Sequence, residues 1–260
     1  MKSGEPSVTA RLVATHRLGF ERAGAPYGDP AADEQLARDV ARGMTPQSDA
    51  RMLTYLAART AFFDRITVAA LDRGVTQVVV VAAGYDGRSL RYARPGVRWF
   101  ELDHPDTQRD KQERIDRLGL AVGHVSFVPS DVLSDDAASR LVASGLDPGV
   151  ASLMLCEGIA VYLDLTVLAS LLHGLRVVAA PTSQLAISVS TSSTSAEHDA
   201  RRSVFQRAVA SLGEPAGTVI TATDSEALLR RAGWLVVGAS AAAATDPVRA
   251  RRAGFVVAWA

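Results

Sequence analysis

Cysteine is nearly absent from this chain, since Cys156 is the only one among 260 residues. A single thiol excludes an intrachain disulfide and a metal site built from several cysteines, and we expect no metal. Because Cys156 lies in an apolar run, we expect a buried small hydrophobe rather than a nucleophile. No run reaches membrane-spanning length and the N-terminus has no apolar signal segment, so we expect a cytoplasmic protein without a membrane partner.

Net charge is also absent, because 28 lysine and arginine residues balance 28 aspartate and glutamate residues. No overall field draws the protein toward nucleic acid, and we expect no nucleic-acid partner. Apolar residues make up 48% and charged residues 22%, which is typical of a soluble globular protein with a sizeable core. At this length we expect one α/β domain spanning residues 1–260.

Strand and helix patterns alternate along most of the chain. The strand patterns lie at 77–82, 98–102, 124–128, 151–156, 184–189, 234–237 and 255–259. The helix patterns lie at 33–42, 48–74, 105–118, 134–144, 165–175 and 225–231. This alternation predicts a doubly wound, mostly parallel sheet with helices on both faces. About 17 residues separate the last two strands, too few for a helical crossover, which favours an antiparallel terminal pair.

The most informative segment begins with four consecutive valines, Val78–Val81. Such an apolar, β-branched run predicts a strand buried on both faces. The turn after it contains Gly84 and Gly87, which let the backbone come close to a ligand. The next predicted strand leads to Asp103, about 20 residues further on, where a carboxylate can bind a ribose hydroxyl pair. The sequence therefore predicts a site for a nucleotide-type cofactor.

A nicotinamide cofactor is one interpretation of this site. Ala82-x-Gly84-x-x-Gly87 is a loose form of the dinucleotide fingerprint. The charged residues Asp86 and Arg88 are unusual in a turn that binds pyrophosphate, and an antiparallel strand pair is unusual in a dinucleotide domain. No Tyr-x-x-x-Lys pair follows. An NAD(P)-binding oxidoreductase or a non-catalytic Rossmann-like protein stays open as an alternative.

Several collinear motifs resemble the leucine carboxyl methyltransferase family, and most closely its bacterial members that act on small molecules. The motifs are AGYDGR at 83–88, FELDHP at 100–105 and CEGIAVYL at 156–163, with further matches at 58–64, 127–132 and 9–31. Together they cover roughly residues 9–190. The sequence departs from the family pattern at Gly87, where threonine is usual, and at Ala82, where glycine is common.

The resemblance implies a class I methyltransferase fold, Rossmann-like, with helical lid segments over the site. Residues 1–50 would form an N-terminal arm or lid, and residues 190–222 a possible lid insertion. The implied cofactor is S-adenosyl-L-methionine, with S-adenosyl-L-homocysteine as its product.

Motif positions also imply roles for individual residues. Arg59 would pair with the methionine carboxylate, and Glu157 would face the methionine amino group. Asp103 would bind the ribose hydroxyls, and Asp131 with the backbone of Val132 would hold the adenine. The expected cofactor site is completed by the turn residues Ala83, Gly84, Asp86 and Arg88. Two structural readings stay open: Asp131 as a helix N-cap, and Asp86 with Arg88 as a brace.

The resemblance further implies O-methylation of a small molecule, and we expect its acceptor to be a carboxylic acid, such as a natural-product or polyketide acid. A carboxylate, with a pKa of about 4, is ionised near neutral pH and needs no catalytic base. A phenol or hydroxyl acceptor would need one, and His16 and His198 in the lid segments are the candidates. Tyr162 and Arg88 are expected to face the cleft, with structural roles equally open.

Overall fold

The computed structural model describes residues 5–44, 50–133, 136–189, 203, 222–236 and 254–260. The predicted lid segment 190–222 lies outside them except for Ser203 and Ala222, and His198 lies outside them as well. Within the described residues, no helix combines the length and the apolar character needed to cross a membrane.

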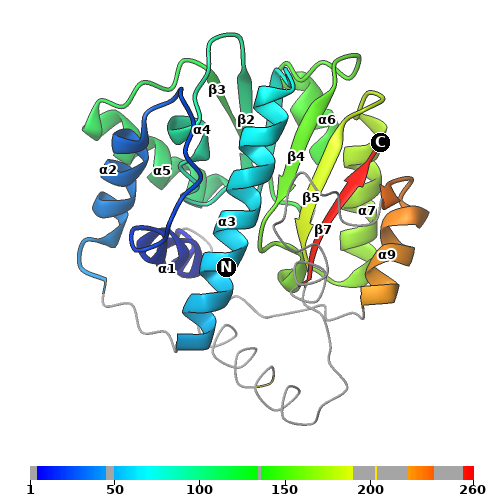
Figure 1. Ribbon diagram of the computed structural model, residues 1–260, viewed down its shortest axis with the longest axis horizontal. Helices are drawn as coiled ribbons and strands as arrows, with labels where there is room; N and C mark the ends of the chain where they lie inside the picture. Colours follow the sequence, from blue (N-terminus) through cyan, green and yellow to red (C-terminus); the bar gives the residue numbers. More distant parts are fainter. Residues whose placement is uncertain (1–4, 45–49, 134–135, 190–202, 204–221, 237–253) are drawn as a thin grey trace.

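A sheet of seven strands forms the centre of the described molecule, in the order β3-β2-β1-β4-β5-β7-β6 (Figure 1). Its strands are β1 (Gln77–Val81), β2 (Arg98–Asp103), β3 (Val125–Pro129), β4 (Ser152–Cys156), β5 (Gln184–Ser188), β6 (Leu235–Val236) and β7 (Phe255–Trp259). Strands β1 to β5 pair in parallel, whereas β7 runs antiparallel to both β5 and β6. The predicted fold class and its antiparallel end are confirmed.

The valine run of β1 is buried on both faces, as its sequence predicts. Val79 and Val81 pack into the larger core, which includes Leu141 of α6 (Ala137–Ala143) and residues of α7 (Leu165–Val177) and α9 (Ala222–Arg231). Val78 and Val80 pack on the opposite face, against α3 (Ala50–Asp72). Since successive side chains of a strand alternate between faces, one apolar run joins the two layers of helices shown in Figure 1.

The remaining helical elements of the described residues are α1 (Val8–Arg17), α2 (Pro30–Ala41), α4 (Arg88–Arg91), α5 (Pro105–Leu118) and the 3-10 turn η1 (Ala160–Tyr162). Helix α2 starts three residues before its predicted start. The side chain of Asp29 accepts a hydrogen bond from Ala32 N at 3.0 Å, and Pro30 occupies the first helical position. Both features favour a helix start. Similarly, α6 starts three residues later than predicted, because Asp136 is its N-cap.

Helix α1 lies near the ends of the parallel strands, and α2 lies beside α4 and α5 (Figure 1). Their apolar residues form a third core cluster with Tyr85 and with Ile115 of α5. Helix α1 is also tied to α5, because Ser7 N donates to Thr107 Oγ1 at 3.0 Å. The arm predicted at residues 1–50 therefore contains two helices, α1 across the turn after β1 and α2 against α4 and α5, whereas its action as a lid stays a prediction.

Candidate functional site

The ends of four parallel strands bring the predicted site residues to one edge of the sheet. Gly84 follows β1, Asp103 ends β2, Asp131 follows β3 and Glu157 follows β4. Strands that pair in parallel end on the same side, and this is where open α/β sheets bind ligands. Residues separated by more than 70 positions in the sequence thus line one edge of the sheet.

The turn after β1 is tight and carries two left-handed residues. Ala82 and Gly84 both have a φ of 52°, and Asp86 N donates to Ala83 O at 2.8 Å. A Cβ atom at Gly84 would lie 2.9 Å from Cβ of Ala10, so α1 runs directly across this glycine. Glycine is therefore required here both for its backbone conformation and for the close approach of α1.

Asp103 is joined to this turn by hydrogen bonds from the backbone. One carboxylate oxygen accepts from Gly84 N, and the other accepts from His104 N at 2.6 Å. Burial raises the pKa of Asp103 to about 6, against the opposing effect of these two hydrogen bonds. Glu101, two residues earlier, is instead buried against Lys111 and Ser89. Asp103 is therefore the carboxylate of β2 that binds the turn after β1.

The end of β3 supplies Ser130, Asp131 and Val132. Ser130 N donates to Asp103 O at 2.8 Å, which joins the ends of β2 and β3. Its hydroxyl is buried and has no hydrogen-bond partner among the described residues. Asp131 accepts from Leu133 N at 3.0 Å, but it does not cap α6, whose N-cap is Asp136. The N-cap reading of Asp131 is therefore wrong for that helix.

Glu157 is held by three arginines. Its carboxylate accepts from Arg59 Nε at 3.0 Å and from Arg88 Nη1 at 2.6 Å, and it pairs with Arg17 Nη2 at 2.8 Å. Burial alone would raise the pKa of Glu157, but the arginines, Arg17 foremost, bring it well below its ordinary value. The structure brings Arg59 and Glu157 together, and their contacts with a cofactor stay predictions. The sequence does not predict the contribution of Arg17, because no pattern links α1 to the end of β4.

Arg88 is completely buried within ion pairs. Its guanidinium pairs with Asp64 at 2.7 Å, with Asp86 and with Glu157, and it also donates to Thr60 O. Arg88 therefore braces Asp86, as one of the two open interpretations expects, and it also braces Asp64 and Glu157. A guanidinium enclosed in this way fixes Glu157 in place, and its expected contact with a ligand stays a prediction.

The ion pairs continue away from the strand ends toward α2. Arg22, in the loop between α1 and α2, pairs with Asp64 at 2.6 Å and with Asp33 at 3.0 Å. Asp33 also pairs with Arg91 of α4. Buried carboxylates and guanidiniums therefore alternate from Glu157 to Arg91, and they tie the N-terminal segment to the turn after β1.

The residues expected to contact the methyl acceptor are Tyr162, His16 and His198, and the structure describes the first two. Tyr162 is the last residue of η1. It lies close enough to Arg59 to affect the pKa of that side chain. Burial lowers the pKa of Arg59, but Glu157, and to a lesser extent Tyr55 and Tyr162, raise it above its ordinary value. His16 lies on α1, and burial lowers its pKa. Among the described residues, no group of three or more histidine, cysteine or acidic side chains could hold a metal ion.

Comparison with known proteins finds a matching family and several similar bacterial proteins. A model of the leucine carboxyl methyltransferase family matches residues 10–176. A "Putative S-adenosyl-L-methionine-dependent methyltransferase" of Mycobacteroides abscessus is 34% identical over 70% of this chain and 60% of its own length. A relative with the same name from Mycolicibacterium gilvum is 31% identical over 75% of this chain and 70% of its own length. A third, from Parafrankia, is 38% identical over 52% of this chain and 44% of its own length.

Solved structures support the fold alone, because their sequence identities are low. A "putative methyltransferase" from Thermobifida fusca aligns with a TM-score of 0.63 at 15% identity, over 99% of this chain and 96% of that one. A duf574 family protein from Streptomyces avermitilis gives 0.59 at 19% identity, over 98% and 97%. The resemblance read from the sequence motifs is confirmed, and the chain belongs to the leucine carboxyl methyltransferase family.

Proposed function

We propose that this protein is an S-adenosylmethionine-dependent O-methyltransferase that forms a methyl ester on a small carboxylic acid. The observation that carries the proposal is the arrangement of Gly84, Asp103, Arg59 and Glu157 along one edge of the sheet. Family membership and the names of the relatives support the cofactor. The chain spans 60% and 44% of the length of two of these relatives, so the methyltransferase activity of the whole protein is part of this proposal.

The residues present fit this cofactor. Asp103 offers a carboxylate beside a glycine turn, which suits a pair of ribose hydroxyls. The buried hydroxyl of Ser130, without a partner among the described residues, is available to a further ligand atom close to Asp103. Arg59 and Glu157 carry opposite charges, and the methionine end of the cofactor carries a carboxylate and an ammonium group. In the described structure these two side chains pair with each other at 3.0 Å, so the methionine end of the cofactor would bind beside an existing ion pair.

When bound, the cofactor supplies an electrophilic methyl group on a sulfonium sulfur. Glu157 and Arg59 would fix the methionine part, and Arg88 would hold Glu157 in position. An acceptor carboxylate oxygen would form the bond to the methyl carbon as the carbon–sulfur bond breaks, with its electron pair left on sulfur. No proton moves in this step, so alignment of the reactants and exclusion of water are sufficient. Helix α1, which lies across Gly84, would contribute to that exclusion.

A hydroxyl acceptor is the second candidate, and the state of His16 is the observation that favours it. Burial lowers the pKa of His16, which favours the neutral imidazole, the form that can accept a proton. Parallel assays with matched acid and hydroxyl compounds distinguish the two candidates. Hydroxyl methylation would show a pH profile that rises with deprotonation of a base, and this rise would disappear in His16→Gln.

Calorimetric titration with S-adenosylhomocysteine, with NAD and NADP in parallel, tests the cofactor. We expect binding of S-adenosylhomocysteine alone, weakened at least tenfold in Asp103→Asn and Glu157→Gln. Circular dichroism would confirm that both variants fold, and Asp116→Ala, which removes an exposed carboxylate of α5, is the matched control. Binding of a nicotinamide cofactor without S-adenosylhomocysteine would contradict the proposal and favour an oxidoreductase.

A further inference from the structure

Lysine is rare in this chain, and one of its lysines is buried. It occurs at Lys2 and Lys111, whereas the other basic residues among the 28 are arginines. Lys111 lies on α5 and is 2% exposed. It shares the buried side of that helix with Thr107, Gln108 and Ile115. Because lysine is almost never fully buried unless its ammonium group is paired, the partners of Lys111 indicate its role.

The ammonium group of Lys111 binds acceptors on two different elements. Its Nζ donates to Asp86 O at 2.7 Å, in the turn after β1. It also pairs with the carboxylate of Glu101 in β2. An ammonium group is a compact charge with three donors, which suits acceptors on separate elements, whereas a planar guanidinium suits a carboxylate bound through two parallel hydrogen bonds. Lysine is therefore well suited to this position in a chain that otherwise uses arginine.

Glu101 has a partner for each of its carboxylate oxygens. One oxygen accepts from Ser89 Oγ at 2.6 Å, and the other accepts from Lys111. The charges of Lys111 and Glu101 neutralise each other, and such a pair can stay buried when its hydrogen bonds are satisfied. The hydrogen bond to Asp86 O therefore links a buried, neutral pair to the turn after β1.

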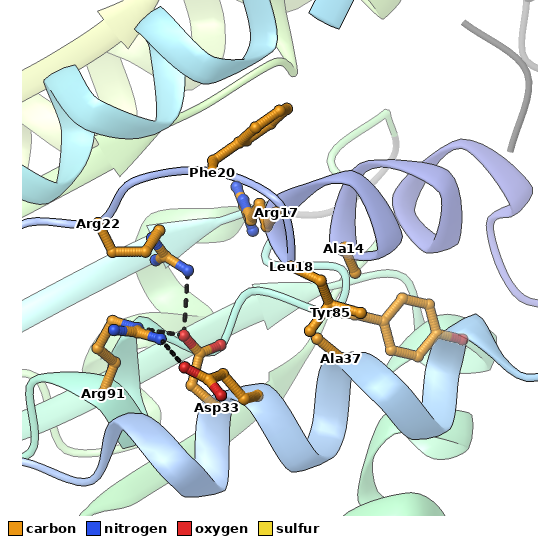
Figure 2. Close-up of a pocket in the computed structure, with 10 residues that line it drawn as sticks. Ala14, Arg17, Leu18, Phe20, Arg22, Asp33, Ala37, Tyr85 and Arg91 are labelled. Carbon is orange, nitrogen blue, oxygen red and sulfur yellow. Dashed lines mark hydrogen bonds and ion pairs between the residues drawn. The ribbon is translucent and has the colours of Figure 1, made fainter.

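Helix α5 holds this turn at two successive residues. The side chain of Tyr85 lines the cavity between α1 and α2 (Figure 2), and its hydroxyl binds Asp110 of α5. The carbonyl of Asp86 binds Lys111, the next residue of α5. The backbone directly after Gly84 is thus anchored from outside the turn, and α5 helps to set its shape.

Lys111 also acts on Asp103, the carboxylate proposed to bind the ribose. Burial raises the pKa of Asp103, and backbone hydrogen bonds from Gly84 and His104 lower it. Of the two charges in the buried pair, Lys111 lowers this pKa and Glu101 raises it. The positive charge of Lys111 therefore favours the ionised form of Asp103, which is the form that accepts hydrogen bonds from hydroxyl groups.

We propose that Lys111 is a positioning residue of the cofactor site, which acts through the Asp86 carbonyl and through the carboxylate of Asp103. Its hydrogen bond fixes the turn before the cofactor binds, so that less ordering is needed on binding. The inference rests on the proposed function, in which Asp103 binds the ribose of S-adenosylmethionine.

Glu101→Gln provides the background for the test, because removing Lys111 alone would leave Glu101 buried without its cation. The amide of Gln can accept from Lys111 and donate to Ser89 Oγ, so its contacts are kept. Lys111→Met is then added, and the single and double variants differ in Lys111 alone. Arg109→Met, which removes an exposed cation of the same helix, is the matched control.

S-adenosylhomocysteine is titrated calorimetrically into the four proteins between about pH 5 and pH 8. We expect the double variant to bind about tenfold more weakly than Glu101→Gln at neutral pH, because the turn has lost its anchor. The pH below which affinity falls should rise by at least about half a unit, since Asp103 has lost a nearby positive charge. Glu101→Gln alone should lower that pH relative to wild type, and Arg109→Met should match wild type.

The results separate this inference from the proposed function. If S-adenosylhomocysteine does not bind to the wild-type protein, the proposed function fails. If it binds, and the double variant has the affinity and pH profile of Glu101→Gln, Lys111 has no positioning role although the proposed function stands. A loss of affinity that is equal at every pH, or a double variant that circular dichroism shows to be unfolded, would assign Lys111 to the fold alone and overturn the inference. Since His104 is unchanged in all four proteins, its titration does not produce a shift between them.

Discussion

Asp33 leaves no room for a side chain at Gly87, because a Cβ atom there would lie 1.8 Å from Oδ1 of Asp33. The φ of Gly87 is −101°, a conformation open to any residue, so the requirement for glycine is steric. Asp33 cannot easily move, since Arg22 and Arg91 both pair with it. Glycine at a position where the family usually has threonine thus accompanies the close packing of α2 on the turn.

Gly87→Ala should therefore destabilise the protein by about 1–3 kcal/mol, as overpacking of a fixed contact does. Gly123→Ala, which would meet nothing within 4 Å, is the control and should be close to neutral. Urea unfolding followed by circular dichroism gives both values. In a double-mutant cycle with Asp33→Ala, the combined loss should be smaller than the sum by at least about 0.5 kcal/mol. Additive losses would mean that Asp33 is not the obstacle.

Ala82 is the second departure from the family pattern, and it adopts a left-handed φ of 52°. This conformation costs an L-residue about 1 kcal/mol, whereas glycine adopts it freely. Ala82→Gly should therefore stabilise the protein by about that amount, less the packing of its methyl group against the core. The midpoint of urea unfolding should rise. A fall as large as that of an ordinary helix Ala→Gly change would contradict the strain argument.

Removing the guanidinium of Arg88 should cost much more. Arg88→Gln leaves Asp64, Asp86 and Glu157 buried without their shared cation, and we expect a loss of about 3–5 kcal/mol. Arg109→Gln, which breaks one exposed surface pair, should cost less than about 1 kcal/mol. An equal loss of unfolding free energy in the two variants would show that the buried ion pairs of Arg88 stabilise the fold no more than an exposed pair does.

The same variant should change unfolding by acid. Burial alone would raise the pKa of each of these three carboxyls, but their arginine partners lower it in the folded protein. Their ionised forms therefore stabilise the fold above about pH 4, and that stability is lost as the pH falls through the lower folded values. In Arg88→Gln the folded pKa values move up, so unfolding should begin at a higher pH. Circular dichroism during acid titration measures this shift.

The centre of the fold could be predicted because its signals are local. Four consecutive valines indicate a strand buried on both faces, and the short spacing before β7 excludes a parallel crossover. Helix α2 begins at Pro30, three residues before the start that apolar periodicity predicts, because Asp29 and Pro30 form a capping signal that periodicity does not include. Helix positions are thus readable where capping residues are weighed together with apolar periodicity.

The charge network could not be predicted, because its partners are distant in sequence. Arg17 pairs with Glu157 across 140 positions, and no periodicity links them. From the sequence, Arg88 is compatible with a ligand contact and with a brace, since a charge two residues from Asp86 permits either. The complete burial of Arg88 supports its role as a brace. This burial depends on how α3 and β4 pack around the turn, which the sequence does not show.

Cys156 should behave as a core residue in spite of its place next to Glu157. Its side chain is fully buried in the larger core, and burial raises the pKa of its thiol to about 12. A thiol reagent such as DTNB should therefore fail to label the native protein and should label one thiol after unfolding in urea. Leu18→Cys, at a partly exposed position, is the positive control. Rapid labelling of the native wild-type protein would show that the end of β4 opens.

Cofactor affinity should depend on pH through Asp103. Burial raises its pKa to about 6, so the carboxylate is ionised at neutral pH and becomes protonated below that value. Only the ionised form accepts hydrogen bonds from both ribose hydroxyls, so protonation competes with the ligand. The affinity for S-adenosylhomocysteine should be constant above about pH 7 and should fall toward tenfold per pH unit below about pH 6.

Asp103→Asn provides the matched test, because the amide is similar in shape and does not titrate. Its affinity should be low and flat between about pH 5 and pH 8, measured by calorimetry, while the wild-type affinity falls toward it. The carboxyls that bind the arginines stay ionised in this range, because their pKa values are lowered. A parallel decline in wild type and variant would assign the titration to another group and would remove Asp103 from the ribose site.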